Sequence, residues 1–411
     1  MEAQIASRTQ IIEDSDIDRS NSGTEPAVPE AVVLKGSDVV VKVLKEVGVD
    51  RVFGIQGGKV IALFDSLSRS DIKMVHCGQE GAAGHMAEGY AESSGKVGVV
   101  IATSGPGATN LATPMLDAYM DSVPLVAITG QVPANDLGTM AFQEGPVFEM
   151  MRKVTKKNYL VTHHESLART LREAFEVARS ERPGPVSVDI TSNVWGKDIR
   201  LIPDEKHKSE SSESVSSRAD QRKERFRQAS IEDVLEAVFE SERPIIYAGG
   251  GVKISGASEL LRIFSEKYKI PVIATLKALG CFPTMSPLYL GMPGMHGTAY
   301  ATHALYNADF VLVIGSRIDD RVIQNPDEFL SHGMNGKIKV IAHIDIDPYE
   351  INKRLDPEKR GGVRFRSLPI SMDAKSFLEE ALKIDHEYGK RKSFSPWHEQ
   401  IEAWKKEYPL P

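Results

Sequence analysis

The sequence predicts an α/β protein with two doubly wound parallel-sheet domains. Short, continuous apolar runs alternate with amphipathic helical segments along most of the 411 residues, and glycine-rich turns follow several of the runs. A continuous apolar run is typical of a strand covered on both faces, as in a parallel sheet between two helix layers. The length allows two or three domains of ordinary size.

The first domain is predicted over residues 34–195. Ser37 is a candidate N-cap for a helix that carries Val39 to Leu44, and βα units follow it in order. The predicted strands are 51–55, 72–76, 97–103, 125–129 and 186–190, and further helices are predicted at 60–67 and 167–180.

The segment from Gln79 to Asn110 is the most informative part of this domain. Small residues at 81–84 leave Glu80 with little around its carboxylate, so a flat ligand could approach it closely. Gly95 is a plausible helix stop, and the turn at 104–107 opens a second helix whose free N–H groups favour an anionic or polar ligand. Taken alone, the segment is equally consistent with a well-capped βα unit whose glutamate faces solvent.

The second domain is predicted over residues 229–384. Its strands are expected at 245–248, 271–275, 310–315 and 340–347, and its helices at 231–239, 259–268 and 374–382. Polar and glycine-rich stretches follow these strands, and open α/β sheets bind ligands at that edge. The triplet Gly249–Gly251 favours either close approach to a phosphate or a simple tight turn. Arg317 and Arg321 could bind a ligand, or they could form a surface ion-pair cluster with the nearby Asp319 and Asp320.

Three further segments are predicted from composition. Residues 1–33 are expected to be a disordered leader, because they are acidic and unlike a transit or signal peptide. Residues 196–228 are expected to be a linker, because they are polar without an apolar period. Residues 385–411 are expected to connect to a third domain.

Several motifs resemble the thiamine-diphosphate-dependent enzymes, specifically the catalytic subunit of acetohydroxyacid (acetolactate) synthases. They are EGAAGHMAEGYA from Glu80, ATSGPGATN from Ala102, the run DSVPLVAITGQVP from Asp121, AFQE from Ala141 and RPGP from Arg182. They occur in the family's order over roughly residues 34–384. The resemblance implies a thiamine-diphosphate pyrimidine-binding domain followed by a Rossmann-like central domain of the FAD-binding type.

The resemblance also implies roles for individual residues. Glu80 would hydrogen-bond the aminopyrimidine ring of thiamine diphosphate in a dry pocket, while Gln143, Gly58 and Lys156 would lie beside the reacting carbon. The implied FAD contacts are Ser122, Arg182, Gly250, Thr275, Leu276, Gly294, Met295, His296, Gly315, Arg317, Asp319, Asp345 and Ile346. The implied reaction joins pyruvate, after loss of carbon dioxide, to a second 2-ketoacid, the first steps of valine, leucine and isoleucine biosynthesis.

Four positions depart from the family pattern. Gln79 and Gly81 flank the glutamate where the family has His and Gln, Lys59 follows the Gly57-Gly58 pair where the family has a small residue, and Ser192 replaces a lysine. Substrate choice is therefore left open, although Lys59 could replace the missing positive charge.

No G-D-G motif occurs in the sequence, although the family uses one in a third domain to bind Mg²⁺ and the diphosphate. We expect the third domain on another polypeptide, or a truncated gene, ahead of a non-catalytic relative. Homo-oligomerisation, a separate C-terminal-domain subunit and a regulatory subunit are the expected partners. The alternatives are a flavin-binding or regulatory relative and another carboligase or decarboxylase, such as a glyoxylate carboligase or pyruvate oxidase type.

Composition excludes several other classes. The net charge of −7 without a basic stripe argues against nucleic-acid binding, and no apolar stretch reaches the roughly 18 residues of a membrane span. Only Cys77 and Cys281 are present, which is too few for a disulfide framework or a zinc cluster. A reducing, cytoplasmic location is the expectation.

Overall fold

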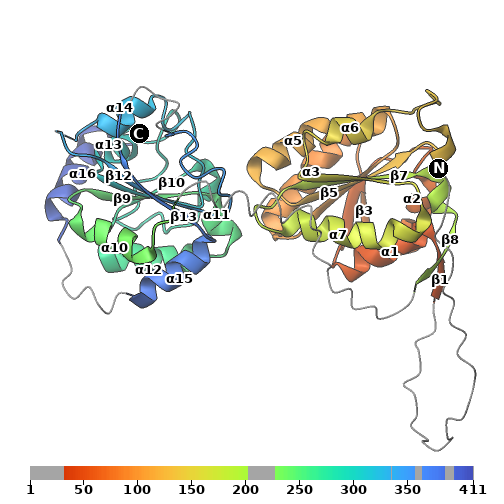
Figure 1. The fold of residues 1–411 in the computed structure, drawn as a ribbon, viewed down its shortest axis with the longest axis horizontal. Helices are drawn as coiled ribbons and strands as arrows, with labels where there is room; N and C mark the ends of the chain where they lie inside the picture. Colours follow the sequence, from red (N-terminus) through yellow and green to blue (C-terminus); the bar gives the residue numbers. More distant parts are fainter. Residues whose placement is uncertain (1–31, 202–226, 335, 357–362, 385–392, 411) are drawn as a thin grey trace, which may run out of the picture.

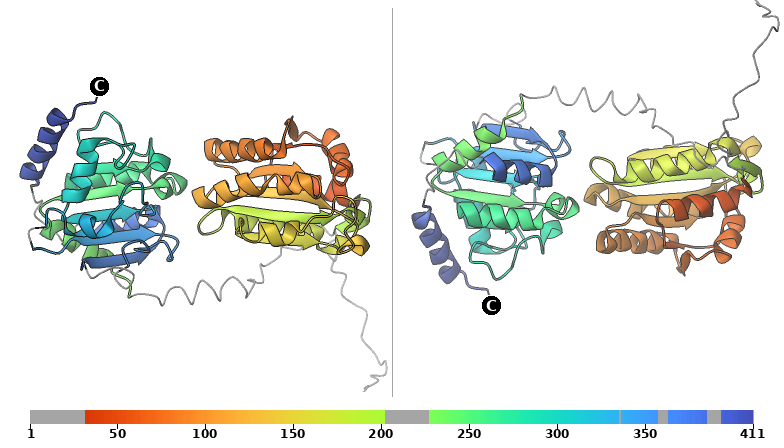
Figure 2. Two further views of the ribbon diagram at one scale, coloured as in Figure 1. Left: turned by 90° about the horizontal axis from the view of Figure 1, so that it is seen from above. Right: turned by 90° about the horizontal axis from the view of Figure 1, so that it is seen from below.

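The computed structural model describes residues 32–201, 227–334, 336–356, 363–384 and 393–410, which form two α/β units (Figure 1). The predicted leader up to residue 31 and the predicted linker from 202 to 226 lie outside the described residues. Each unit has a parallel sheet with helices on both faces, as the two views of Figure 2 show. The prediction of two parallel-sheet α/β units is confirmed.

The first unit is built on a six-stranded sheet in the order β3-β2-β4-β5-β7-β6. Its strands are β2 (Arg51–Gly54), β3 (Lys73–His76), β4 (Gly98–Ala102), β5 (Leu125–Gln131), β6 (Lys157–Val161) and β7 (Pro185–Thr191), all paired in parallel. Every residue of β4, β5 and β7 is buried. The continuous apolar runs therefore correspond to the central strands.

Helices cover both faces of this sheet and define two hydrophobic layers. One layer holds α1 (Gly36–Glu46), α2 (Ile61–Ser68) and α7 (Leu167–Arg179); the other holds α3 (Glu80–Ser94), α5 (Ala112–Asp121) and α6 (Val147–Met151). The buried residues of α7 recur at three- and four-residue spacing, which is why it lies with one face on the sheet. The short helices are α4 (Pro106–Thr109), α8 (Ser192–Trp195), η1 (Ala134–Asp136) and η2 (His164–Ser166).

The predicted cap at the first helix is wrong. Helix α1 begins at Gly36 with Lys35 as its N-cap, and the Ser37 hydroxyl instead accepts a hydrogen bond from Ser66 of α2 at 2.9 Å. Glycine is needed at position 36, because the Cβ of any other residue would lie 2.2 Å from the carbonyl oxygen of Val194. The helix stop at Gly95 is confirmed, with a φ of 71°.

The predicted boundaries of the first unit are too narrow. Strand β1 (Val32–Lys35) pairs antiparallel with β8 (Asp198–Leu201), so residues 32–33 of the expected leader and 198–201 of the expected linker are ordered strands. Lys35 and Asp198 form an ion pair at 2.8 Å across this ladder. Each strand has four residues and is largely exposed, so no apolar period in the sequence marks it. The two strands also lie far apart in the sequence, so no local pattern predicts their pairing.

The second unit is built on a five-stranded parallel sheet in the order β10-β9-β11-β12-β13. Its strands are β9 (Pro244–Ala248), β10 (Val272–Ala274), β11 (Phe310–Ile314), β12 (Val340–Asp345) and β13 (Arg366–Ser371). Its helices are α10 (Ile231–Glu240), α11 (Gly250–Ile254), α12 (Ser258–Tyr268), η3 (Leu276–Ala278), α13 (Ala299–Asn307), α14 (Pro326–Ser331) and α15 (Ala374–Ile384). Helix α10 starts with a capping box between Ser230 and Asp233.

Part of the segment predicted to connect to a third domain is a helix that packs on the second unit. Helix α16 (Ser395–Glu407) belongs to the core of the second unit, because Trp397 and Ile401 are each 2% exposed. The indole Nε1 of Trp397 donates to the carbonyl oxygen of Pro244 at 3.0 Å. Helix α16 buries only a single apolar stripe. Its composition is therefore close to that of a linker and did not predict its burial.

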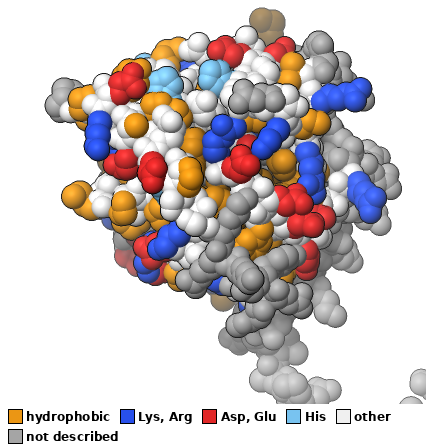
Figure 3. All heavy atoms as spheres, turned by 90° about the vertical axis from the view of Figure 1, so that its left-hand side faces the viewer, with side chains coloured by type: hydrophobic (Ala, Val, Ile, Leu, Met, Phe, Trp, Pro, Cys, Tyr) orange, Lys and Arg blue, Asp and Glu red, His pale blue; other side chains and the backbone are white. Residues whose placement is uncertain are grey.

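The outer surface of the second unit mixes both signs of charge. Figure 3 shows the face of the second unit that points away from the first unit, where acidic and basic side chains are interspersed. Among the described residues, none of the helices combines the length and apolar character needed to cross a membrane.

The close packing of α3 on β4 yields a stability prediction. A Cβ on Gly98 would lie 2.3 Å from the carbonyl oxygen of Ala87, whereas a Cβ on Gly89 would meet nothing within 4 Å. Gly98→Ala should therefore lower the free energy of unfolding by about 2 kcal/mol or more through overpacking. Gly89→Ala should leave it unchanged or raise it by up to about 1 kcal/mol, because alanine is the better helix former. Urea unfolding of both variants tests this, and equal stability of the two would contradict it.

Candidate active site and interdomain cavity

Glu80 is the first residue of α3 and follows β3 at the carboxyl edge of the first sheet. The helix start is held by Gln79, whose Oε1 accepts from the amide of Ala82 at 2.8 Å. The Glu80 carboxylate accepts a hydrogen bond from Nδ2 of Asn110 at 2.9 Å, and the side chain is half-exposed. Both the amide and the positive end of the helix dipole favour a negative charge here.

The turn after β4 leaves bare backbone beside this carboxylate. A Cβ on Gly107 would lie 3.3 Å from Oε1 of Glu80 and 2.8 Å from Cγ2 of Thr103, and Gly105 has a φ of 53°. Glycine at position 107 therefore lets Glu80 and Thr103 pack directly against the backbone of this turn. The Ser104 hydroxyl is fully buried without a hydrogen-bond partner among the described residues.

Gln143 lies against the same turn. A Cβ on Gly105 would be 2.6 Å from the carbonyl oxygen of Gln143, which itself has a φ of 61°. Two residues further on, the carbonyl of Gly145 accepts from Nε2 of Gln131 at 3.2 Å. The structure thus brings Gln143 to the edge that carries Glu80.

Asp189 anchors this loop from inside the sheet, and sequence reasoning missed it. Its carboxylate accepts from Nε2 of Gln131 at 2.9 Å and from Oγ1 of Thr129 at 2.8 Å. Asp189 is 1% exposed, and this burial raises its pKa to about 7. A charged residue in the otherwise apolar and small-residue run PVSVDIT was the signal that could have found it.

Gly58 and Lys59 belong to the same edge, after β2. A Cβ on Gly58 would meet nothing within 4 Å, so space is open beside it. The amide of Lys59 donates to Oγ1 of Thr103 at 3.2 Å, and its carbonyl accepts from Nε1 of Trp195 at 2.7 Å. Ser192, another departure from the family pattern, follows β7 at this edge.

Lys156 does not join these residues. It precedes β6, whereas Glu80 follows β3, and the strands are parallel, so the two residues belong to opposite edges of the sheet. Its ammonium donates to the carbonyls of Val177 and Ser180 at 2.6 and 2.7 Å. Burial lowers its pKa to about 8. In this chain Lys156 therefore caps the end of α7 and does not line the space beside Glu80.

A cavity of about 730 Å³ lies between the two units, at the amino edge of the first sheet and the carboxyl edge of the second. Its size is that of a small-molecule or cofactor site. All but one of the predicted flavin contacts line it, namely Ser122, Arg182, Gly250, Thr275, Leu276, Met295, His296, Gly315, Arg317, Asp319, Asp345 and Ile346. Gly294 does not line it; with a φ of 91° it shapes the loop that carries Met295 and His296.

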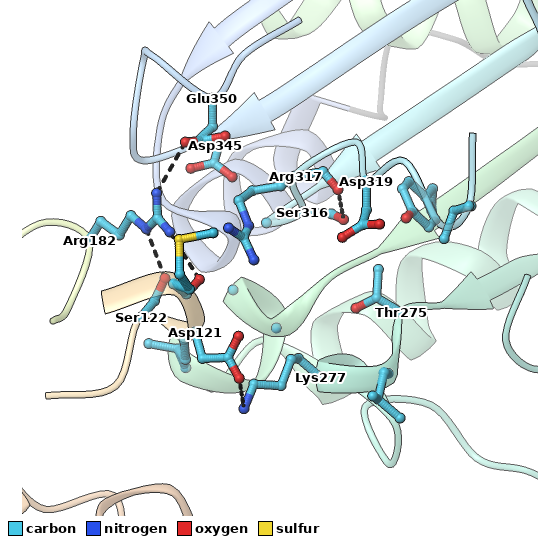
Figure 4. A pocket seen from close by; sticks show the side chains of 18 of the residues that line it. Asp121, Ser122, Arg182, Thr275, Lys277, Ser316, Arg317, Asp319, Asp345 and Glu350 are labelled. Carbon is cyan, nitrogen blue, oxygen red and sulfur yellow. Dashed lines mark hydrogen bonds and ion pairs between the residues drawn. The ribbon is translucent and has the colours of Figure 1, made fainter. Parts of the chain in front are cut away.

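Charged residues cross between the two units on both sides of this cavity (Figure 4). Arg182 of the first unit pairs with Glu350 at 3.2 Å and Asp347 at 3.5 Å, and its Nε donates to the Ser122 hydroxyl at 2.8 Å. In the other direction, Lys277 of the second unit pairs with Asp121 at 2.8 Å and also with Glu92. Sequence reasoning found Arg182 but missed Lys277 and Glu350, because an ion pair between distant loops leaves no local pattern.

The glycine triplet after β9 serves two purposes. A Cβ on Gly249 would lie 2.1 Å from the carbonyl oxygen of Gly315, and one on Gly251 would lie 2.7 Å from the Cα of Gly315. These two glycines let the turns after β9 and β11 pack backbone against backbone. Gly250 is free of this packing, since the nearest atom to its Cβ position is Cβ of Lys277 at 3.2 Å, and it lines the cavity.

The cavity offers both a cation and a carboxylate to a ligand. The Arg317 side chain points into it, and Arg317 forms no ion pair with the described residues, so the alternative of a surface ion-pair cluster is not what the structure shows. Asp345 ends β12 and accepts from the amide of Asp347 at 2.8 Å. Burial raises the pKa of Asp345 to about 6.

One group of side chains has the spacing of a metal site. His85, Glu88 and Asp117, from α3 and α5, each place a ligand atom within 4.8 Å of the others. Nδ1 of His85 already lies 3.0 Å from the Glu88 carboxylate, and burial raises the Glu88 pKa. A hydrogen bond between the two explains this group without a metal ion.

Comparisons with known proteins agree with both units. The family described as thiamine pyrophosphate enzyme, N-terminal TPP binding domain matches residues 34–151, and the thiamine pyrophosphate enzyme central domain matches residues 231–380. The chain therefore belongs to the thiamine pyrophosphate enzymes and carries their N-terminal and central domains.

Within that family the chain is similar to acetolactate synthases. It is 40% identical over 385 residues to the acetolactate synthase large subunit of Corynebacterium glutamicum. That alignment covers 93% of this chain and 58% of that protein. It is 38% identical to the acetolactate synthase large subunit of Lactococcus lactis, over 91% of this chain and 61% of that protein. It is 41% identical to the chloroplastic acetolactate synthase 1 of Oryza sativa, over 94% of this chain and 56% of that protein. The chain spans less than two thirds of the length of these relatives.

The buried carboxylate of Asp189 predicts a pH effect on stability. Its folded-state pKa of about 7 lies above the ordinary value of 3.8. The unfolded chain therefore releases this proton at lower pH than the folded chain, and the contribution of Asp189 to stability falls as the pH rises from about 4 to about 7. We predict that the free energy of unfolding, measured in urea, falls between about pH 4.5 and about pH 7.5. The fall should be roughly 2 to 4 kcal/mol larger for the wild type than for Asp189→Asn.

The exposed Asp136 offers the control, because Asp136→Asn should follow the wild type at both pH values. An identical pH dependence in Asp189→Asn and the wild type would show that Asp189 ionises normally in the folded chain.

Proposed function

We propose that this chain supplies the pyrimidine-binding wall and the flavin-binding domain of an acetolactate synthase-type enzyme. The observation that carries the proposal is Glu80 at the start of α3, held by Asn110 at 2.9 Å and facing bare backbone at Gly107. Sequence identity of about 40% to acetolactate synthases over more than nine tenths of the chain supports the reaction type.

The residues at the Glu80 edge fit the pyrimidine half of thiamine diphosphate. Glu80 can share a proton with a ring nitrogen, and space is open beside Gly58 for a flat ring. The buried hydroxyl of Ser104 has no hydrogen-bond partner among the described residues. When bound, thiamine diphosphate supplies the carbon nucleophile that attacks the keto carbon of pyruvate and carries the electrons left by carbon dioxide. Gln143, held through Gln131 and Asp189, lies where it can position the ketoacid.

The residues of the interdomain cavity fit a flavin nucleotide. Arg317 provides a free cation for the phosphates, Asp345 provides an acceptor for ribose hydroxyls, and Gly250 leaves backbone exposed. Residues of both units line the cavity and ion pairs join the units beside it, so a bound flavin would contact both. We therefore assign FAD as the occupant.

The diphosphate and Mg²⁺ need a further domain. The 411 residues contain no G-D-G motif, and Glu80 is half-exposed without an opposing wall among the described residues. We propose that this wall comes from a diphosphate-binding domain outside these residues, brought to Glu80 by assembly of chains. Pyruvate and a second 2-ketoacid are the proposed substrates.

A second candidate is a flavin-binding protein without turnover. It is favoured by one contrast in the structure, because described residues of both units line the interdomain cavity, whereas the Glu80 side chain is half-exposed. The two functions are separated by acetolactate formation from pyruvate when thiamine diphosphate, Mg²⁺, FAD and a diphosphate-binding partner are supplied. Production of acetolactate rules out the second candidate.

Glu80→Gln should lower turnover in the assembled enzyme by about 100-fold or more, because a neutral amide cannot share the proton with the cofactor ring. The visible spectrum of bound FAD should not change, since the cavity lies at the other edge of the sheet. The exposed Glu165 gives a matched control, and Glu165→Gln should keep wild-type turnover. Turnover of Glu80→Gln within about threefold of the wild type would refute the assigned role.

A further inference from the structure

The loop that carries Gln143 has a strained backbone. It runs from residue 137 to residue 146, between η1 and α6. Met140 and Gln143 have φ values of 60° and 61°, in the left-handed region that residues other than glycine seldom adopt. Such a backbone persists only where its surroundings hold it, so an interaction must fix this loop.

Burial of apolar side chains does not supply that interaction. Met140 is 94% exposed and Phe142 is 84% exposed, so the two large apolar side chains at the outer end of the loop contribute little to holding it. The end of the loop is attached to the sheet, because the carbonyl of Gly145 accepts from Gln131 at 3.2 Å. The outer part of the loop must be held by other means.

The carboxylate of Glu144 holds the outer part of the loop from within. Its two oxygens accept from different backbone amides, Oε1 from Gly138 at 2.5 Å and Oε2 from Ala141 at 3.1 Å. The amide of Glu144 donates in turn to the carbonyl of Ala141 at 2.8 Å. The hydrogen bond from Gly138, with smaller contributions from other loop amides, lowers the pKa of Glu144. The acceptor is therefore ionised near neutral pH, and hydrogen bonds to an ionised acceptor are the stronger kind.

The closed loop packs on the turn beside Glu80. A Cβ on Gly105 would lie 2.6 Å from the carbonyl oxygen of Gln143, and a Cβ on Gly145 would lie 3.2 Å from the Cα of Gly105. The loop therefore lies backbone against backbone on the turn that follows β4, at the edge of the sheet that carries Glu80. Opening of the loop would move Gln143 away from that edge.

We propose that Glu144 is a positioning residue, which holds the 138–145 loop closed and so keeps Gln143 in place for the ketoacid. This inference rests on the proposed function, which assigns the substrate contact to Gln143. Glu144 acts without touching the substrate, because each of its carboxylate oxygens already accepts a hydrogen bond from the loop.

The first measurement is hydrogen exchange on the purified chain, which needs no cofactor. Glu144→Gln keeps the shape of the side chain but replaces the two charged acceptor oxygens with one neutral acceptor. Backbone amides at 138–144 should therefore exchange about 5-fold faster or more, while those of β4 stay unchanged. Asp136→Asn is the matched control and should exchange as the wild type does. It neutralises an exposed carboxylate just before the same loop, whose side chain accepts no hydrogen bond within the described part of the chain.

The second measurement separates positioning from general stability. In the enzyme assembled with thiamine diphosphate, Mg²⁺, FAD and a diphosphate-binding partner, Glu144→Gln should lower kcat/KM for pyruvate about 10-fold or more. Its Tm and its FAD affinity should equal those of the wild type, and Asp136→Asn should match the wild type in all three.

Three results would overturn the inference: exchange of the loop as in the wild type, faster exchange with kcat/KM within about twofold of the wild type, or a lower Tm of Glu144→Gln that accounts for its loss of activity. Absence of acetolactate from the wild-type assembly would instead overturn the proposed function and, with it, the positioning role. The exchange result would then still show whether Glu144 closes the loop.

Discussion

The common direction of the strands within each sheet is the constraint on which the rest of the structure depends. All strands of a parallel sheet end at one edge, so the loops after β2, β3 and β4 gather Gly58, Glu80 and Ser104 together. The loops that precede β5 and β7, with Ser122 and Arg182, necessarily gather at the opposite edge. That opposite edge faces the carboxyl edge of the second sheet across the cavity. The pyrimidine wall and the flavin cavity are thus separated by the length of the strands of the first sheet.

Close backbone packing and buried polar groups give each site its shape. Gly98 lets α3 approach β4, which places Glu80 beside Gly107, and Asp189 holds Gln131 and the loop of Gln143 from within the sheet. At the cavity, the ion pairs of Arg182 and Lys277 join the two units. Partly exposed pairs of this kind contribute little free energy each, so a ligand that contacts both units would add most to their association.

The sequence predicted those parts of the molecule that have a local signal. Continuous apolar runs marked the central strands, and motif resemblance marked Glu80 and twelve of the residues that line the cavity. Features that depend on distant partners were missed: the pairing of β1 with β8, the burial of α16, and the ion pair between Lys277 and Asp121. Lys156 was misplaced for the same reason, since only strand direction shows that it belongs to the opposite edge from Glu80.

Hydrogen exchange of the purified chain with and without FAD tests the separation of the two sites most directly. Exchange reports local opening along the backbone, so protection maps where the ligand is bound. We predict that FAD slows exchange in segments of both units around the cavity, at 120–122, 181–183, 249–251 and 315–321, and leaves 104–110 and 143–145 unchanged. Protection confined to one unit, or protection that reaches the Glu80 edge, would contradict the arrangement of two sites on opposite edges of the first sheet.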